Sequence, residues 1–194
     1  MERLRYILFH KPYGVLSSFT DPEGRPTVKD YVDVPEVYAA GRLDFDSEGL
    51  MLLTNDGPLI HRLTQPRYHM PKTYLAQVEG EVTAEALRRL REGVVIKGYR
   101  TQPAEAEQVP DPGLPERSKP VTPHGPTSWI RLTLREGKKR QVRHMTAAVG
   151  LPTLRLVRVA IGPLTLDGLA PGEWRELTGL EKQVLLRSTG LRRG

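Results

Sequence analysis

Residues 40–57 read AGRLDFDSEGLMLLTNDG, and this stretch decides how the rest of the chain is interpreted. Asp44, Asp46 and Glu48 occupy every second position directly before the apolar run LMLL. That run has the length and composition of a short buried strand. Because Asp-Gly readily supplies a positive φ, we expect Asn55-Asp56-Gly57 to turn the chain after this strand.

The three acids allow several interpretations. The segment matches the first half of a calcium loop, but the twelfth position, which should hold a bidentate glutamate, is Asn55. Asp44 and Asp46 could form the acid–base pair of a glycosidase, yet a basic chain with two tryptophans offers little else for a sugar. From these residues alone, a solvated acidic turn and a single working carboxylate both remain open.

The composition is that of a basic globular protein. The chain has 194 residues, of which 38% are hydrophobic and 27% charged, enough for one core or for two small lobes sharing a cleft. The net charge of +6 favours a polyanionic partner about as much as it favours mere solubility. The chain has no cysteine, which excludes disulfide scaffolds and thiolate metal sites. Its first apolar run is too short for a signal peptide or a membrane span, so we expect a cytoplasmic location.

The residue patterns predict many strands and few helices. One helix is expected over residues 83–92, with Thr83 as its N-cap and Gly93 at its end. A second is expected over residues 139–149. The proline-rich segment 108–127 should be a loop or insertion, because proline cannot join a helix or a sheet interior. These patterns indicate the α+β class with a largely antiparallel, mixed sheet. The expected strands cover residues 5–10, 50–54, 72–79, 94–96, 129–135, 154–159 and 174–178.

A run of basic residues opens the second expected helix. Lys138, Lys139, Arg140 and Arg143 lie within six positions there. They form either a solvated helix face or a phosphate clamp. A carboxylate near arginines stays ionised, and an ionised, positioned carboxylate can act as a nucleophile. Together with Asp44, this run indicates an enzyme that acts on nucleic acid.

The stretch 41–57 closely resembles the active-site signature of the RsuA/RluB/RluE/RluF group of pseudouridine synthases. Four further segments resemble motifs of this group in the same order, and the matches run from about residue 8 to residue 178. These segments are His10-Lys11-Pro12-Tyr13-Gly14-Val15-Leu16, His61-Arg62-Leu63-Thr64-Gln65-Pro66 with Lys72-Thr73-Tyr74, Glu136-Gly137-Lys138-Lys139-Arg140-Gln141-Val142-Arg143-His144-Met145, and Ile161-Gly162-Pro163-Leu164 with Gly172-Glu173-Trp174-Arg175.

This resemblance implies the pseudouridine synthase catalytic fold, a single domain over residues 1–194 with two lobes around a central RNA-binding cleft. We expect it to lack the S4-type RNA-binding domain of most members. The tract 20–31 most resembles the RluE type, which modifies large-subunit (23S) ribosomal RNA. The implied reaction breaks the uridine N1–C1′ bond, rotates the uracil and rejoins it through C5, without cofactor or metal. A monomer that does not bind membranes is expected.

The resemblance also implies roles for particular residues. Asp44 is the catalytic carboxylate, Tyr74 stacks on the target base, and Arg143 pairs with the carboxylate. Asp46 and Glu48 are bystanders. From charge and motif position we expect RNA contacts from Lys11, Arg42, Lys138, Lys139 and Arg140, although Arg42 has an ion pair with Asp46 or Glu48 as its structural alternative. The main functional alternative is a non-catalytic RNA-binding or ribosome-assembly protein with the same fold; a metal-dependent nuclease is a third.

Overall fold

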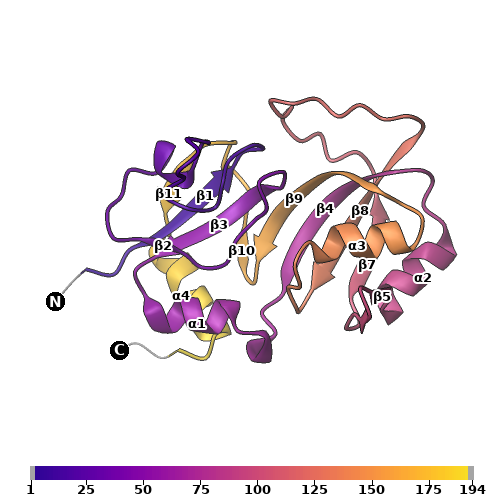
Figure 1. Ribbon diagram of the computed structural model, residues 1–194. Coiled ribbons are helices and arrows are strands. Elements are labelled where there is room, and N and C mark those ends of the chain that lie inside the picture. Colours follow the sequence, from indigo (N-terminus) through magenta and orange to yellow (C-terminus); the bar gives the residue numbers. More distant parts are fainter. Residues whose placement is uncertain (1–2, 192–194) are drawn as a thin grey trace. The chain divides into compact units, whose positions relative to one another are not determined.

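A computed structural model of the protein describes residues 3–191, which form two compact units. Unit 1 contains the residues up to Met70 together with those from Arg158 onward, and unit 2 is Pro71–Val157. Strand β9 (Thr153–Ile161) begins in unit 2 and ends in unit 1 (Figure 1). No helix within residues 3–191 has the length and apolar character needed to cross a bilayer.

Unit 1 is built around two antiparallel strands, β1 (Tyr6–Lys11) and β3 (Glu48–Thr54), with Leu8 opposite Leu52. Every residue of both strands is buried. Strands with both faces covered have continuous apolar runs instead of alternation, as in the LMLL segment. The flanking strands are β11 (Trp174–Glu176), paired with β1, and β9, which follows β3 in the strand order; β2 (Tyr38–Ala39) pairs with β3, and β10 (Leu164–Thr165) with β9.

Unit 1 also contains helices α1 (Gly57–Thr64) and α4 (Gly179–Ser188), and the short 3₁₀ helices η1 (Val28–Asp30) and η2 (Pro66–Tyr68). Helix α1 corrects the prediction of a turn at Asn55-Asp56-Gly57. Asp56 is its N-cap, and its carboxylate accepts a hydrogen bond from the Leu59 N–H at 3.2 Å. The same carboxylate accepts one from the buried Tyr6 hydroxyl at 2.7 Å. The Asp-Gly pair therefore starts a helix, because aspartate is also a favoured N-cap.

Unit 2 packs two helices on one face of its strands. The strands are β4 (Lys72–Glu79), β7 (Glu105–Val109), β8 (Thr127–Leu134) and the hairpin β5 (Val95–Ile96) and β6 (Tyr99–Arg100); the helices are α2 (Ala84–Glu92) and α3 (Gln141–Ala148). Strand β8 pairs antiparallel with β4 on one side and β7 on the other. Thr83 and Gly93 cap α2 as predicted. The core joins Ala76, Leu90, Ile130, Leu132 and Met145, so it includes both helices and both central strands.

The proline-rich segment lies between β7 and β8, and residues 110–126 form neither helix nor strand; the loop is shorter than the predicted 108–127, because Gln108 and Val109 belong to β7 and Thr127 to β8. Several hydrogen bonds join it to the rest of unit 2. Arg155 donates to the Pro115 carbonyl at 2.7 Å, and the His124 N–H donates to the Glu79 carboxylate at 2.6 Å. With its largely antiparallel strands and few helices, the protein belongs to the predicted α+β class.

Candidate active site

Asp44 lies in the segment between β2 and β3, and the backbone around it is held on both sides. Leu43 is buried and exchanges two hydrogen bonds with Ser17: its N–H donates to the hydroxyl at 2.9 Å, and its carbonyl accepts from the hydroxyl at 2.6 Å. The Ser47 N–H donates to the Asp44 carbonyl at 3.0 Å. The Asp44 side chain is partly exposed. The fold therefore presents this carboxylate at the surface of unit 1 on a hydrogen-bonded turn.

Lys11 is a buried structural residue, and its predicted contact with RNA is wrong. The side chain is 0% exposed. Its ammonium group donates to three backbone carbonyls: Pro12 at 3.0 Å, Val15 at 2.6 Å and Phe45 at 3.3 Å. An ammonium group has three donors, so these carbonyls satisfy all of them. Lys11 thus connects the end of β1 to the turn that carries Asp44 and has no donor left for a phosphate.

The three acids of the opening stretch all act on this buried cation. Burial lowers the pKa of Lys11 from 10.5 to about 8, while the charges of Glu48, Asp46 and Asp44 oppose that shift. Glu48 has the largest opposing effect and is only 2% exposed. The sequence suggested that Glu48 is a bystander in the reaction, and that remains a prediction. In the fold, however, Glu48 is part of a buried charge cluster.

Removing the Lys11 charge should change how stability depends on pH. Between pH 8 and 10.5 the unfolded chain keeps a proton on Lys11 that the folded protein has released, so the free energy of unfolding rises with pH in this window. A pKa difference of this size corresponds to about 3 kcal/mol. We expect Lys11→Met to lose this rise in urea denaturation across the window. Lys182→Met is the control and should keep it; the same pH profile in Lys11→Met and the wild type would contradict the assignment.

Gly49 lies in close contact with the backbone of Arg158 in β9. Its φ is +114°, a region that favours glycine. A Cβ at this position would lie 2.2 Å from the Arg158 carbonyl oxygen and 2.7 Å from its nitrogen. Arg158 is buried, and its Nε donates to the Leu50 carbonyl at 2.9 Å. The glycine of the signature therefore allows β9 to lie against the start of β3, five residues after Asp44.

Arg42 is exposed, immediately before the Leu43–Asp44 turn. Within residues 3–191 it forms no ion pair, so the alternative role of Arg42, a structural ion pair with Asp46 or Glu48, is not observed. Its guanidinium group remains available to a ligand at the surface of unit 1.

Tyr74 belongs to unit 2, in the middle of β4 and opposite Leu132 of β8. Ala76 and Val78 are buried in the core, and Tyr74 packs against the same cluster while remaining partly exposed. Tyr74 is therefore a strand residue whose side chain faces the core, and part of this side chain is exposed at the surface of unit 2.

The basic run does not open a helix as predicted. Helix α3 begins at Gln141, and Arg140 is its N-cap in a left-handed conformation with φ 53°. Lys138 and Lys139 are exposed in the turn before it, and only Arg143 lies in the helix. Val142 and Met145 of α3 are buried. Three of the four cations therefore lie in an irregular turn.

This basic turn is organised by Glu136, which the sequence analysis did not single out. Its carboxylate accepts hydrogen bonds from the Tyr99 hydroxyl at 2.7 Å, the Gln102 N–H at 2.8 Å and the Gln141 amide at 2.7 Å. Burial acts to raise the pKa of Glu136, but these hydrogen bonds outweigh it and lower the pKa below its usual value. The Lys138 ammonium lies over the Tyr99 ring, 4.4 Å from its centroid. The one signal available in the sequence was that Glu136 starts the basic motif.

The predicted residues are thus divided between the units. Asp44, Arg42 and the buried Lys11 belong to unit 1, while Tyr74 and Arg143 belong to unit 2 with the basic turn Lys138–Arg140. Among residues 3–191, no three His, Asp or Glu side chains are grouped as a metal site would require.

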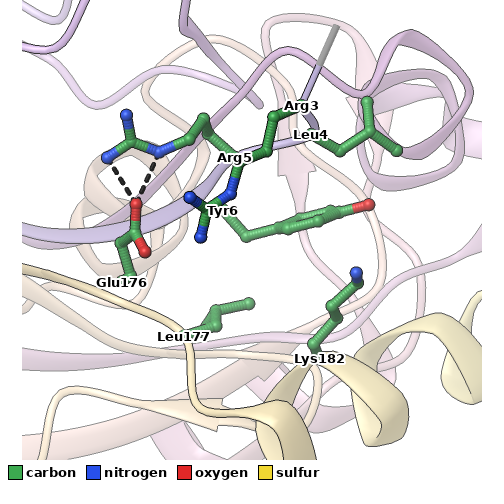
Figure 2. Close-up of a pocket in the computed structure, with 7 residues that line it drawn as sticks. All are labelled: Arg3, Leu4, Arg5, Tyr6, Glu176, Leu177 and Lys182. Carbon is green, nitrogen blue, oxygen red and sulfur yellow. Dashed lines mark hydrogen bonds and ion pairs between the residues drawn. The ribbon is translucent and has the colours of Figure 1, made fainter. Parts of the chain in front are cut away.

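Unit 1 also has a surface pocket of about 400 Å³ that contains none of the predicted residues. Figure 2 shows Lys182 pointing towards the Tyr6 ring on one side and Arg5 paired with Glu176 on the other. The Arg5 N–H donates to the Asn55 side chain at 2.7 Å. These contacts attach the start of β1 to β11 and α4. The pocket is lined by Arg3, Leu4, Arg5, Tyr6, Glu176, Leu177 and Lys182.

Comparison with known proteins places this architecture in a family. The sequence profile described as RNA pseudouridylate synthase matches residues 5–148. A protein of Vibrio vulnificus named ribosomal large subunit pseudouridine synthase E is 55% identical over 176 residues, 90% of this chain and 75% of that protein. A protein of the same name from Xanthomonas axonopodis pv. citri is 55% identical over 170 residues, 85% of this chain and 90% of that protein.

The fold comparison agrees with the sequence comparison. A solved structure described as the crystal structure of pseudouridylate synthase superimposes with a TM-score of 0.79 at 34% identity, covering 95% of this chain and 75% of that one. The profile match spans both units, and the related sequences and the solved structure indicate the same family. The chain therefore belongs to the RNA pseudouridylate synthase family.

Proposed function

We propose that this protein isomerises uridine to pseudouridine at one site, or very few sites, in 23S ribosomal RNA. The observation that carries the proposal is the 55% identity, over most of the chain, to proteins named for pseudouridine synthesis in the large subunit. The family match runs through both units, which supports treating them as parts of one catalytic domain. We expect a monomer of 21.8 kDa acting on ribosomal RNA in the cytoplasm, a mass that light scattering measures directly.

In this proposal Asp44 is the catalytic carboxylate. The isomerisation breaks N1–C1′ and forms C5–C1′; C5 loses a proton and N1 gains one, so no atom is added or removed. A positioned, ionised carboxylate can serve as a nucleophile or as an acid–base group in such a sequence. We assign Arg143 to keep Asp44 ionised, because a nearby guanidinium favours the charged form of a carboxyl group. Tyr74 is assigned to stack on the uracil.

A uridine within folded RNA must leave its stack to react, at a cost of roughly a few kcal/mol. Contacts with the RNA backbone would offset this cost. We assign these contacts to Arg42, Lys138, Lys139 and Arg140, and no longer to Lys11, because its ammonium is fully used inside unit 1.

The test incubates the purified protein with unmodified 23S RNA in a metal-chelating buffer and maps pseudouridine by carbodiimide blocking of primer extension. We expect one blocked position, or very few, that are absent without the protein. RNA cleavage in place of modification would assign a nuclease. Tight RNA binding without any new block would support the alternative, a non-catalytic RNA-binding or ribosome-assembly protein.

The basic turn gives a second measurable prediction. Lys139 is exposed, and within residues 3–191 it makes no ion pair or hydrogen bond. If it contacts a phosphate, Lys139→Gln should weaken RNA binding and reduce the slope of log K against log salt by about 0.7 to 0.9. Lys182→Gln, in the pocket of Figure 2, is the matched control and should keep the wild-type slope. An unchanged slope in Lys139→Gln would show that this lysine does not contact a phosphate and is only a solvated surface residue.

A further inference from the structure

Phe45 is an exposed aromatic residue directly after Asp44. Its side chain is 39% exposed, whereas Leu43, two positions earlier, is 7% exposed. Its neighbours Asp44 and Asp46 are partly exposed and polar, and Arg42 is exposed. A single exposed apolar side chain needs no explanation by itself. This one lies next to the proposed catalytic carboxylate and among charged side chains, where an RNA substrate would contact it.

The backbone of Phe45 is held from two directions. Its carbonyl accepts hydrogen bonds from the Gly14 N–H at 2.9 Å and from the Lys11 ammonium at 3.3 Å. The ring lies beside Gly14, where an added Cβ would be 3.9 Å from the ring atom Cζ. The Ser47 N–H donates to the Asp44 carbonyl, so the backbone that carries both the ring and the carboxylate is held in one hydrogen-bonded turn. A ring on a preformed turn costs less backbone ordering when it binds a flat ligand than a ring on a mobile segment.

We propose that Phe45 is a stacking platform for an RNA base that flanks the target uridine, and this inference rests on the proposed function. When a uridine leaves the helix, each neighbouring base loses a stacking partner. An exposed aromatic ring can take its place, because every base has a π-face and stacking on aromatic side chains is the usual way in which proteins hold unstacked bases. Phe45 has no polar group to read a base edge, so the contact tolerates any base at that position.

The sign of charge around the ring fits this assignment. Asp44 and Asp46 repel phosphates, while Arg42 attracts them. A base presented to Phe45 brings a neutral flat surface beside the two carboxylates, and its phosphate is then within the field of the exposed guanidinium. Phe45 is accordingly a substrate-contacting residue that orients the RNA, and Asp44 performs the chemistry.

The experiment combines substitutions of Phe45 with removal of single bases from the RNA. The substrate is a 23S RNA fragment containing the site mapped for the wild type, made with an abasic nucleotide at one position on either side of the target. Dissociation constants come from filter binding with wild-type protein, Phe45→Ala, Phe45→Trp and Phe45→Leu. We expect Phe45→Ala to bind the intact RNA about tenfold more weakly, Phe45→Trp to bind like the wild type, and Phe45→Leu to fall near Phe45→Ala.

The decisive result is non-additivity at one position. Removing the base that stacks on Phe45 should weaken wild-type binding about tenfold and leave Phe45→Ala binding unchanged, because both changes delete the same contact. Additive losses at every flanking position, or Phe45→Leu binding as tightly as the wild type, would overturn the proposal. Pseudouridine formation by the wild type on the intact fragment is measured in parallel. Its absence would refute the proposed function, whereas its presence with additive losses would refute only the stacking platform.

Discussion

Asp44→Asn is expected to abolish detectable pseudouridine formation in 23S RNA. Asparagine removes the negative charge and the proton-accepting oxygen, and the loss of a positioned acid–base group alone costs about 10²–10⁴-fold in rate. The fold should tolerate the change, since the Asp44 side chain is partly exposed and the turn is closed through its backbone carbonyl. The measurement is single-turnover modification of the mapped site, followed by carbodiimide blocking, with RNA binding assayed alongside.

Asp46→Asn is the matched control for this experiment. Asp46 is two positions away, is also partly exposed, and also acts on the Lys11 charge. The two variants therefore remove the same charge from the same cluster, but only one removes the proposed catalytic group. We expect Asp46→Asn to retain most of the activity and both variants to bind RNA. Full activity in Asp44→Asn would refute the mechanism. Equal losses of activity in both variants would show that the loss comes from the changed charge of the cluster and not from a catalytic role of Asp44.

Gly49→Ala should unfold or severely destabilise the protein. The new Cβ would meet the Arg158 carbonyl oxygen at 2.2 Å, so β3 and β9 would have to separate. Its φ of +114° adds a conformational penalty for any residue with a side chain. Overpacking costs about 1–3 kcal/mol and a left-handed backbone about 1–2 kcal/mol, so we expect a loss of about 2–5 kcal/mol in the free energy of unfolding. Urea denaturation followed by circular dichroism measures it.

Gly57→Ala provides the comparison for Gly49→Ala. Gly57 is the first residue of α1, its φ is not positive, and a Cβ there would have no atom within 4 Å. Alanine is a better helix former than glycine, so the substitution should be neutral or slightly stabilising. A Gly49→Ala variant as stable as Gly57→Ala would show that the contact with Arg158 relaxes more easily than the geometry indicates.

Local signals in the sequence were sufficient for elements whose capping and periodicity agree. Helix α2 begins after Thr83 and ends at Gly93 because both residues act as local caps. Strand β4 keeps its predicted bounds. Helix α1 was missed because Asp-Gly serves equally well in a hairpin turn and at a helix start, and local sequence does not distinguish the two.

Burial explains what the sequence could not reveal about the candidate site. The motif around Asp44 was recognisable, but a lysine before Pro-Tyr-Gly has the same charge whether its ammonium faces phosphate or three carbonyls. The close approach at Gly49 was equally hidden, because its partner Arg158 is 109 positions away in the chain. Such contacts depend on tertiary structure. Glu136 is intermediate, since it begins the basic motif but acquires its role only when Tyr99, from the β5–β6 hairpin, reaches it.

The division of β9 between the units sets an order of events during synthesis. Residues 71–157 are continuous in the chain, so the contacts within unit 2 form between segments that emerge from the ribosome together. Strands β1 and β3 emerge before unit 2, but their partners after Arg158 are translated after it. The outer edges of these two apolar strands therefore stay unpaired until the residues from Arg158 onward are made. Truncating the chain before Arg158 should leave an aggregation-prone nascent protein, which makes early termination more harmful to this fold than its small size suggests.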